Sequence, residues 1–88
     1  IFITMNIYVG NLDFKVEEQD LQEVFEEYGS VSSTKIITDK FTGRSKGFGF
    51  VEMDDSDSAN KAISELNGSQ LEDRDMVVNE ARPRKSNY

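Results

Sequence analysis

The segment Lys46–Met53, with the sequence KGFGFVEM, constrains the fold of this chain more than any other stretch. Large apolar residues alternate along most of it with small or charged ones, which predicts a β-strand. Successive side chains of a strand point to opposite sides of the sheet. Phe48 and Phe50 therefore share one face of the predicted strand, and Val51 and Met53 share the other.

A second strand is predicted at Met5–Gly10, where Ile7 and Val9 point one way and Tyr8 the other. Two amphipathic helices elsewhere in the chain need an apolar sheet face to pack on, so we assign Ile7, Val9 and Val51 to the core. The opposite face of the sheet then carries three aromatic residues, which are Tyr8, Phe48 and Phe50. A contiguous apolar patch in contact with solvent usually marks an interaction site.

The two helices are predicted from apolar residues that recur at helical spacing. In the first helix these are Leu21, Val24, Phe25 and Tyr28. In the second they are Ala59, Ala62, Ile63 and Leu66. Asp55 or Ser56 is suited to cap the start of the second helix, and Asn67-Gly68 is suited to end it.

Val31–Thr38 reads as another strand, followed by the polar loop Asp39–Ser45, and Asp75–Ala81 reads as the last strand. The element order is therefore βαββαβ. This order predicts an α+β fold of the ferredoxin-like type, in which a four-stranded antiparallel sheet carries both helices on one face.

A chain of 88 residues can build one modest hydrophobic core, so we expect one domain. We place it at residues 5–83, with a short extension at 1–4 and a tail at 84–88. The sequence contains no cysteine and no histidine, which removes thiolate metal sites and the commonest general base. We expect a protein that is not an enzyme and uses no cofactor or metal. No apolar run approaches a membrane span of about 18 residues, and we expect a cytoplasmic protein.

The two aromatic-bearing strands resemble the signatures of one family. Lys46–Met53 matches the pattern K/R-G-F/Y-G/A-F-V-x-F/Y at all positions except the last, where Met53 replaces an aromatic residue. Ile7–Leu12, with the sequence IYVGNL, resembles the family's second signature. The chain thus resembles the RNA-recognition motif family, and within it the small bacterial and glycine-rich-protein type. The resemblance implies a monomer that binds single-stranded RNA, or single-stranded DNA, in post-transcriptional regulation or RNA chaperoning.

The resemblance also implies roles for individual residues. Tyr8 and Phe50 would each stack on a base, Phe48 would pack against sugar rings, and Lys46 would pair with a phosphate. The last strand and the residues after it would contact base edges and the RNA backbone. The expected RNA-contacting residues are Tyr8, Phe48, Phe50, Lys46, Lys35, Asn6, Asn79 and Arg82.

Simpler interpretations remain open for several of these residues. Lys46, Lys35 and Arg82 could be solvated charges that only keep the protein in solution. Phe41 stands in the polar loop, where packing across its own loop is favoured over stacking on RNA. The glycines of KGFGFVEM are expected to keep the core side of the strand small, so that the strand can lie close to the helices.

The net charge of −7 opposes general binding to polyanions, because non-specific nucleic-acid affinity comes mainly from neutralised phosphates. The acids concentrate at Glu17–Glu27, whereas Lys35–Lys46 is net positive, so a basic strip can coexist with an acidic protein. The acidic first helix also supports an alternative function, that of a protein-interaction module using its helical face. A phosphatase of similar fold would need an arginine at the end of the first strand, where the sequence is Gly10-Asn11-Leu12-Asp13, so we disfavour an enzyme.

Overall fold

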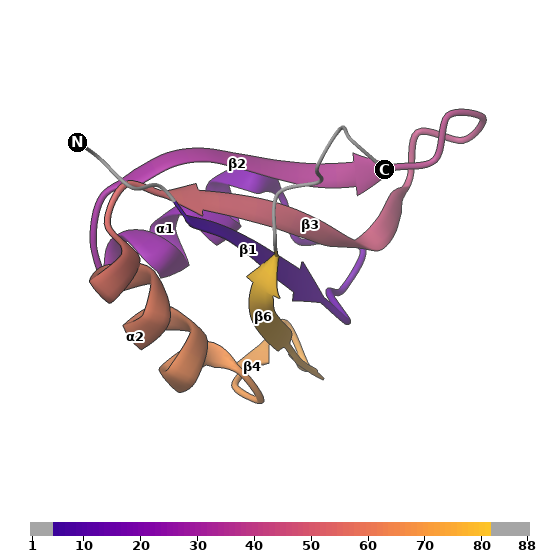
Figure 1. Cartoon of the computed structure of the whole chain (residues 1–88). Coiled ribbons are helices and arrows are strands. Elements are labelled where there is room, and N and C mark those ends of the chain that lie inside the picture. The colour runs from indigo at the N-terminus through magenta and orange to yellow at the C-terminus, as the bar shows by residue number, and fades with distance from the viewer. Residues whose placement is uncertain (1–4, 82–88) are drawn as a thin grey trace, which may run out of the picture.

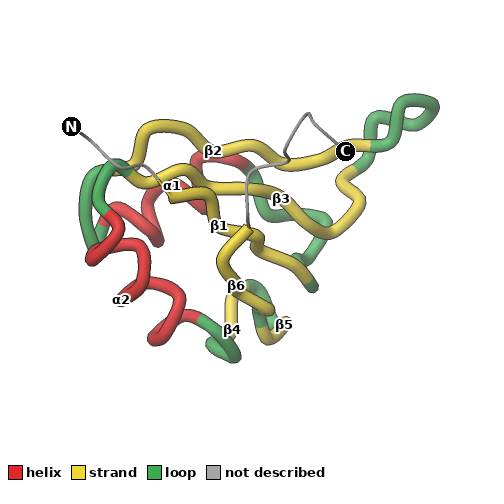
Figure 2. Tube along the Cα trace, viewed as in Figure 1, coloured by secondary structure: helices red, strands yellow, loops and turns green. Residues whose placement is uncertain are grey.

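The computed structural model describes residues 5–81. They form a four-stranded sheet with two helices on one face and a small two-stranded sheet (Figures 1 and 2). The elements in chain order are β1 (Met5–Gly10), α1 (Glu18–Glu26), β2 (Val31–Thr38), β3 (Ser45–Met53), α2 (Ser56–Leu66), β4 (Gln70–Leu71), β5 (Arg74–Asp75) and β6 (Val77–Ala81). The main sheet has the order β2-β3-β1-β6 with every pair antiparallel. Both helices pack on the same face of this sheet, the lower one in Figure 1, and leave the upper face open. The predicted ferredoxin-like arrangement is confirmed.

The end of the chain differs from the prediction in one respect. The last strand begins at Val77, and Arg74–Asp75 instead pairs with Gln70–Leu71 in a small hairpin. Glu72 and Asp73 make the turn with φ angles of 53° and 71°, the left-handed conformation that a tight two-residue hairpin turn requires at both central positions. Because neither residue is glycine, the sequence carries no usual sign of this turn.

The core lies between the helices and the lower face of the sheet. Its sheet-side members are fully buried, and they are Ile7, Val9, Val51, Met53 and Val78. The helices contribute Leu21, Phe25, Ala59, Ala62 and Leu66 to the same cluster. The assignment of alternate strand residues to the core is therefore confirmed, including Met53, a flexible side chain that fills space where the family signature has an aromatic ring.

Side-chain hydrogen bonds cap the N-terminus of each helix. Asp55 caps α2, since its carboxylate accepts a hydrogen bond from the Ser58 N–H at 2.9 Å. This bond and the one from the Ser58 hydroxyl hold the pKa of Asp55 below its ordinary value. In α1 the Asp20 carboxylate accepts from the Glu17 N–H at 2.9 Å. Within residues 5–81, neither helix is long and apolar enough to cross a membrane.

Gly49 permits close pairing between β2 and β3, which are the strands drawn side by side at the top of Figure 1. A Cβ atom at Gly49 would overlap the Lys35 carbonyl oxygen and would lie 3.2 Å from the Ile36 Cα. The sequence interpretation, in which this glycine let the strand approach the helices, is wrong at this position. The close neighbour is the backbone of β2, beside the irregular register between Ile36 and Thr38.

Gly49→Ala is expected to lower the free energy of unfolding by about 1 to 3 kcal/mol, because the backbone of β2 must shift to admit the methyl group. Denaturant unfolding followed by circular dichroism measures this loss. Gly43→Asn is the control, since Gly43 has a φ of 73°, which asparagine tolerates, and a Cβ there would meet no atom within 4 Å. Equal unfolding midpoints for the two variants would contradict the steric assignment.

Candidate nucleic-acid interface

Three aromatic rings meet at the centre of the uncovered sheet face, and we refer to Tyr8, Phe48 and Phe50 as the aromatic cluster. Tyr8 on β1 is directly opposite Phe50 on β3. Ring centroids are 5.9 Å apart for Tyr8 and Phe48, 5.9 Å for Tyr8 and Phe50, and 6.2 Å for Phe48 and Phe50. Phe50 is 37% exposed although it stands in a central strand. The rings contact one another laterally, and Phe50 is the most exposed of the three, while Tyr8 and Phe48 are half-buried.

Strand register places several polar residues that are expected to contact RNA on the same sheet face as the aromatic cluster. One row across the sheet reads Asn79, Tyr8, Phe50 and Lys35, and the next reads Ala81, Asn6, Glu52 and Ser33. Lys35 and Asn79 are exposed at the two ends of the first row, and Asn6 is half-buried beside the cluster. Glu80 instead pairs with Ile7, so it belongs to the other face. Arg82 lies outside the described residues.

Lys46 is exposed at the start of β3, where the backbone departs from regular strand geometry. Gly47 has a φ of 87°, a left-handed conformation that favours glycine, and its carbonyl accepts a hydrogen bond from the Leu12 N–H at 2.8 Å. This bond draws the β1–α1 loop against β3. Lys46 thus lines a hollow together with Tyr8 and Phe48.

Gly10 fixes the position of the Tyr8 ring. A Cβ atom at Gly10 would lie 2.8 Å from two carbons of that ring, so the ring rests directly over the glycine. The sequence interpretation treated Gly10 only as the end of a strand. A side chain at Gly10 would displace the Tyr8 ring from this position.

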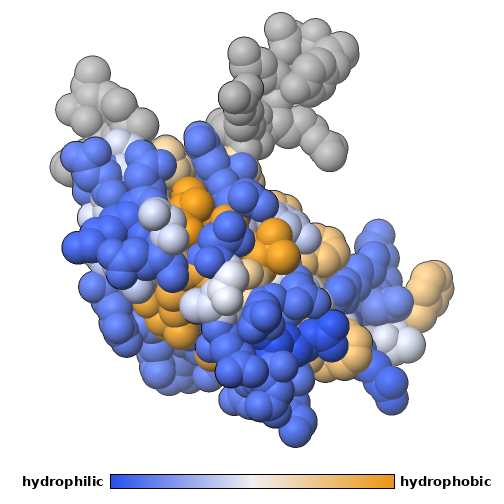
Figure 3. All heavy atoms as spheres, turned by 90° about the horizontal axis from the view of Figure 1, so that it is seen from below, coloured by the Kyte–Doolittle hydropathy of each residue, from blue (hydrophilic) through white to orange (hydrophobic). Residues whose placement is uncertain are grey.

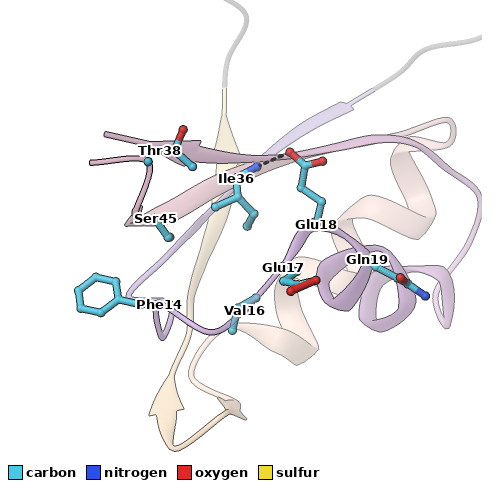
Figure 4. Close-up of a pocket in the computed structure, with 9 residues that line it drawn as sticks. Phe14, Val16, Glu17, Glu18, Gln19, Ile36, Thr38 and Ser45 are labelled. Carbon is cyan, nitrogen blue, oxygen red and sulfur yellow. Dashed lines mark hydrogen bonds between the residues drawn. The ribbon is translucent and has the colours of Figure 1, made fainter. Parts of the chain in front are cut away.

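Two exposed aromatic residues stand outside the cluster. Phe14, in the β1–α1 loop, is 69% exposed and projects beside Ser45 (Figure 4), and the sequence analysis did not single it out. Phe41, in the β2–β3 loop, is 96% exposed, so the expectation that it packs across its own loop is wrong. The Asp39 carboxylate accepts from the N–H groups of Phe41 and Thr42, and this turn directs the ring outward. Figure 3 shows hydrophobic atoms at the end of the molecule where this loop projects.

The electrostatic field is uneven along the sheet. Hydrogen bonds from the Ser32 hydroxyl and then the Ser30 hydroxyl hold the pKa of Asp54 below its ordinary value, so Asp54 is ionised at neutral pH. Asp54 follows β3 directly and adds to the charge of Glu52. The end of β3 is therefore acidic, whereas its start carries Lys46. Phosphates are favoured at the Lys46 end.

The acids of α1 lie away from the cluster. The helix covers the opposite sheet face, and the view of the helical side in Figure 3 is mostly hydrophilic. A hollow of about 430 Å³ between the start of α1 and β2 is lined by Glu17 and Glu18 (Figure 4). Glu18 accepts a hydrogen bond from the Ile36 N–H at 3.1 Å, which ties the helix to β2. This hollow carries the wrong charge for a phosphate.

Within residues 5–81, the antiparallel sheet has one face that the helices leave open, with aromatic residues on its two central strands and cations and amides at its margins. This combination is typical of the RNA-binding class of ferredoxin-like domains. The chain belongs to the RNA recognition motif family, whose profile matches residues 7–77. Both signature segments lie on the two central strands, so the family resemblance of the sequence is confirmed.

Three similar proteins illustrate the relationship. RbpE of Nostoc sp., named for RNA binding, is 51% identical over 81 residues, which cover 92% of this chain and 82% of RbpE. The glycine-rich RNA-binding protein blt801 of Hordeum vulgare is 46% identical over 79 residues, covering 90% of this chain and 49% of blt801. The crystal structure of RNA binding protein PG1 superimposes with a TM-score of 0.89 at 50% identity, covering 93% of this chain and 99% of PG1.

Phe50→Ala is expected to weaken binding to short single-stranded RNA by roughly 1 to 3 kcal/mol, because it removes one stacking surface. Fluorescence anisotropy measures the affinity, and thermal unfolding measures stability. Val51→Ala is the matched neighbour on the buried side of β3, and it should lower stability while leaving RNA affinity nearly unchanged. If Phe50→Ala lowered the melting temperature more than Val51→Ala, the ring would belong to the stabilising core and not to the interface.

Proposed function

We propose that this domain binds short single-stranded RNA by stacking bases on the aromatic cluster. The observation that carries the proposal is the position of three rings in mutual contact on the sheet face that both helices leave open, with their aliphatic strand neighbours buried behind them. A protein without a ligand would gain stability by covering such rings. The names of the relatives, which specify RNA binding, support the same ligand.

In the proposed complex, Tyr8 and Phe50 each stack on one base, and Phe48 packs against the sugars between them. Each base stacked on an aromatic ring contributes roughly 1 to 3 kcal/mol, and every base offers a π-face, so the domain selects sequence only weakly. Single-stranded DNA can use the same rings. The 2′-hydroxyl, as donor and acceptor, then distinguishes RNA from DNA at the amides of Asn6 and Asn79.

Cations supply a smaller share of the affinity. Lys46 and Lys35 are exposed on or beside the sheet face and would pair with phosphates, and Arg44 is exposed in the adjoining loop. Arg82, outside the described residues, is proposed as a further contact. We propose that the domain acts as a cytoplasmic monomer in post-transcriptional regulation or RNA chaperoning, where weak sequence selection and fast release suit many transient targets.

Binding of a random-sequence single-stranded RNA pool tests this function through its salt dependence. With three or four phosphate contacts at about −0.7 each, the slope of log K against log salt is expected to be about −2 to −3. Anisotropy titrations at several salt concentrations measure it. A slope steeper than about −5, or no binding at low salt, would contradict the proposed mode.

The alternative of a protein-interaction module on the acidic helix receives no support from the comparisons. The double variant Glu23→Lys/Glu26→Lys is expected to raise RNA affinity by less than about two-fold at physiological salt, because charges on the opposite face are screened over roughly 8 Å. The same anisotropy assay measures this change. A large gain or loss would mean that α1 contacts RNA, which the fold does not allow for a strand bound on the aromatic cluster.

A further inference from the structure

A hollow of about 270 Å³ adjoins the aromatic cluster at the start of β3. Tyr8 and Phe48 line it, so it adjoins the surface on which bases are proposed to stack. Phe14 stands in its lining from the β1–α1 loop, the position from which Figure 4 shows that ring projecting. Lys46 and Arg74 also line it. Thus aromatic surface and positive charge occur together.

Arg74 reaches this site because the fold connects the β4–β5 hairpin to the end of β1. Its guanidinium donates to the Asn11 side-chain oxygen at 3.1 Å. The Asn11 side-chain amide in turn donates to the Asp75 carbonyl at 2.6 Å, and Asn11 has a φ of 56°. Asparagine tolerates this left-handed conformation better than most residues. The two bonds position the arginine in the lining of the hollow.

The positive charge and several N–H donors of Arg74 remain available to a ligand. Its bonded partner here is a neutral amide, and a guanidinium has five N–H donors in a planar fork, so several remain. Planar forks of this kind match phosphate oxygens two at a time. The described lining of the hollow includes no carboxylate, in contrast to the hollow beside Glu17 and Glu18.

We propose that this hollow receives one nucleotide of the bound RNA, adjacent to those stacked on the aromatic cluster. Its phosphate lies between Lys46 and Arg74, and its base packs against Phe14. The inference rests on the proposed RNA binding and adds a residue from the β4–β5 hairpin to the interface. Asn11 is a positioning residue, because it acts through Arg74.

Arg74→Ala tests the phosphate contact with a short single-stranded RNA. The expected result is a three- to ten-fold loss of affinity and a salt slope that is shallower by about 0.7, the share of one phosphate contact. Lys61→Ala is the matched control, since Lys61 is an exposed cation on α2, on the far side of the sheet, and should change neither quantity. Phe14→Ala should weaken binding about five-fold or more with an unchanged slope.

Asn11→Gly tests the positioning. Glycine keeps the left-handed backbone and removes both side-chain bonds, so affinity should fall two- to three-fold while the salt slope stays unchanged, because the charge remains. In the double variant with Arg74→Ala, the loss from Asn11→Gly should disappear, since a positioning residue has no effect without its partner. Additive losses would overturn the assigned role of Asn11.

Circular dichroism first establishes that each variant is folded. If Arg74→Ala is not folded, Arg74→Gln replaces it, because the glutamine amide can still donate a hydrogen bond to Asn11. The slope of log K against log salt should then become shallower by the same amount. If the Arg74 variant had the same RNA affinity and salt slope as Lys61→Ala, the inference would be overturned. A loss of RNA affinity in Phe50→Ala, measured in the same series, would still support the proposed RNA binding. Failure of the original protein to bind RNA would overturn both.

Discussion

The antiparallel pairing of β1 with β3 at the centre of the sheet is the interaction on which the rest of this structure depends. It sets Ile7 opposite Val51 on the side that the helices cover and Tyr8 opposite Phe50 on the side that they leave open. A shift of one residue in this register would exchange the two sets, burying the rings and exposing the core. Stability and the RNA-binding surface are thus two results of the same register.

The charges are arranged so that an acidic protein can bind a polyanion. Acidic groups concentrate on α1, behind the sheet, and at the end of β3, where serine hydroxyls stabilise ionised Asp54. Lys46 lies at the start of β3, and Arg74 of the β4–β5 hairpin lines the same hollow. A strand crossing the aromatic cluster therefore meets opposite potentials at the two ends of β3. This difference in potential favours one placement of the nucleic-acid backbone along β3, although the net charge of −7 limits the total attraction between the protein and the nucleic acid.

The parts of the fold that depend on strand alternation and helical spacing could be predicted from sequence. The bounds of β1 and β2 match the expectation, as does the separation of Phe50 from Val51, because burial imposes these patterns locally. The β4–β5 hairpin could not be predicted, since its turn uses two acidic residues in left-handed conformation. Arg74 was missed for a related reason: its position comes from a bond to Asn11 across most of the chain. The outward direction of Phe41 results from the hydrogen bonds of Asp39, which composition does not reveal.

The central place of β1 has a consequence for how the domain folds and unfolds. β1 comes first among the described strands, yet its partners, β3 and β6, follow much later in sequence, so both pairings close long loops. In the proposed complex, a nucleic-acid strand stacked on Tyr8 and Phe50 would bridge one of these distant pairings on the open face of the sheet. A ligand that binds only the paired state raises the free energy of unfolding by an amount that grows with the logarithm of the ratio of ligand concentration to Kd. Occupied domains should therefore open their central strands less often than empty ones, and resist proteolysis longer.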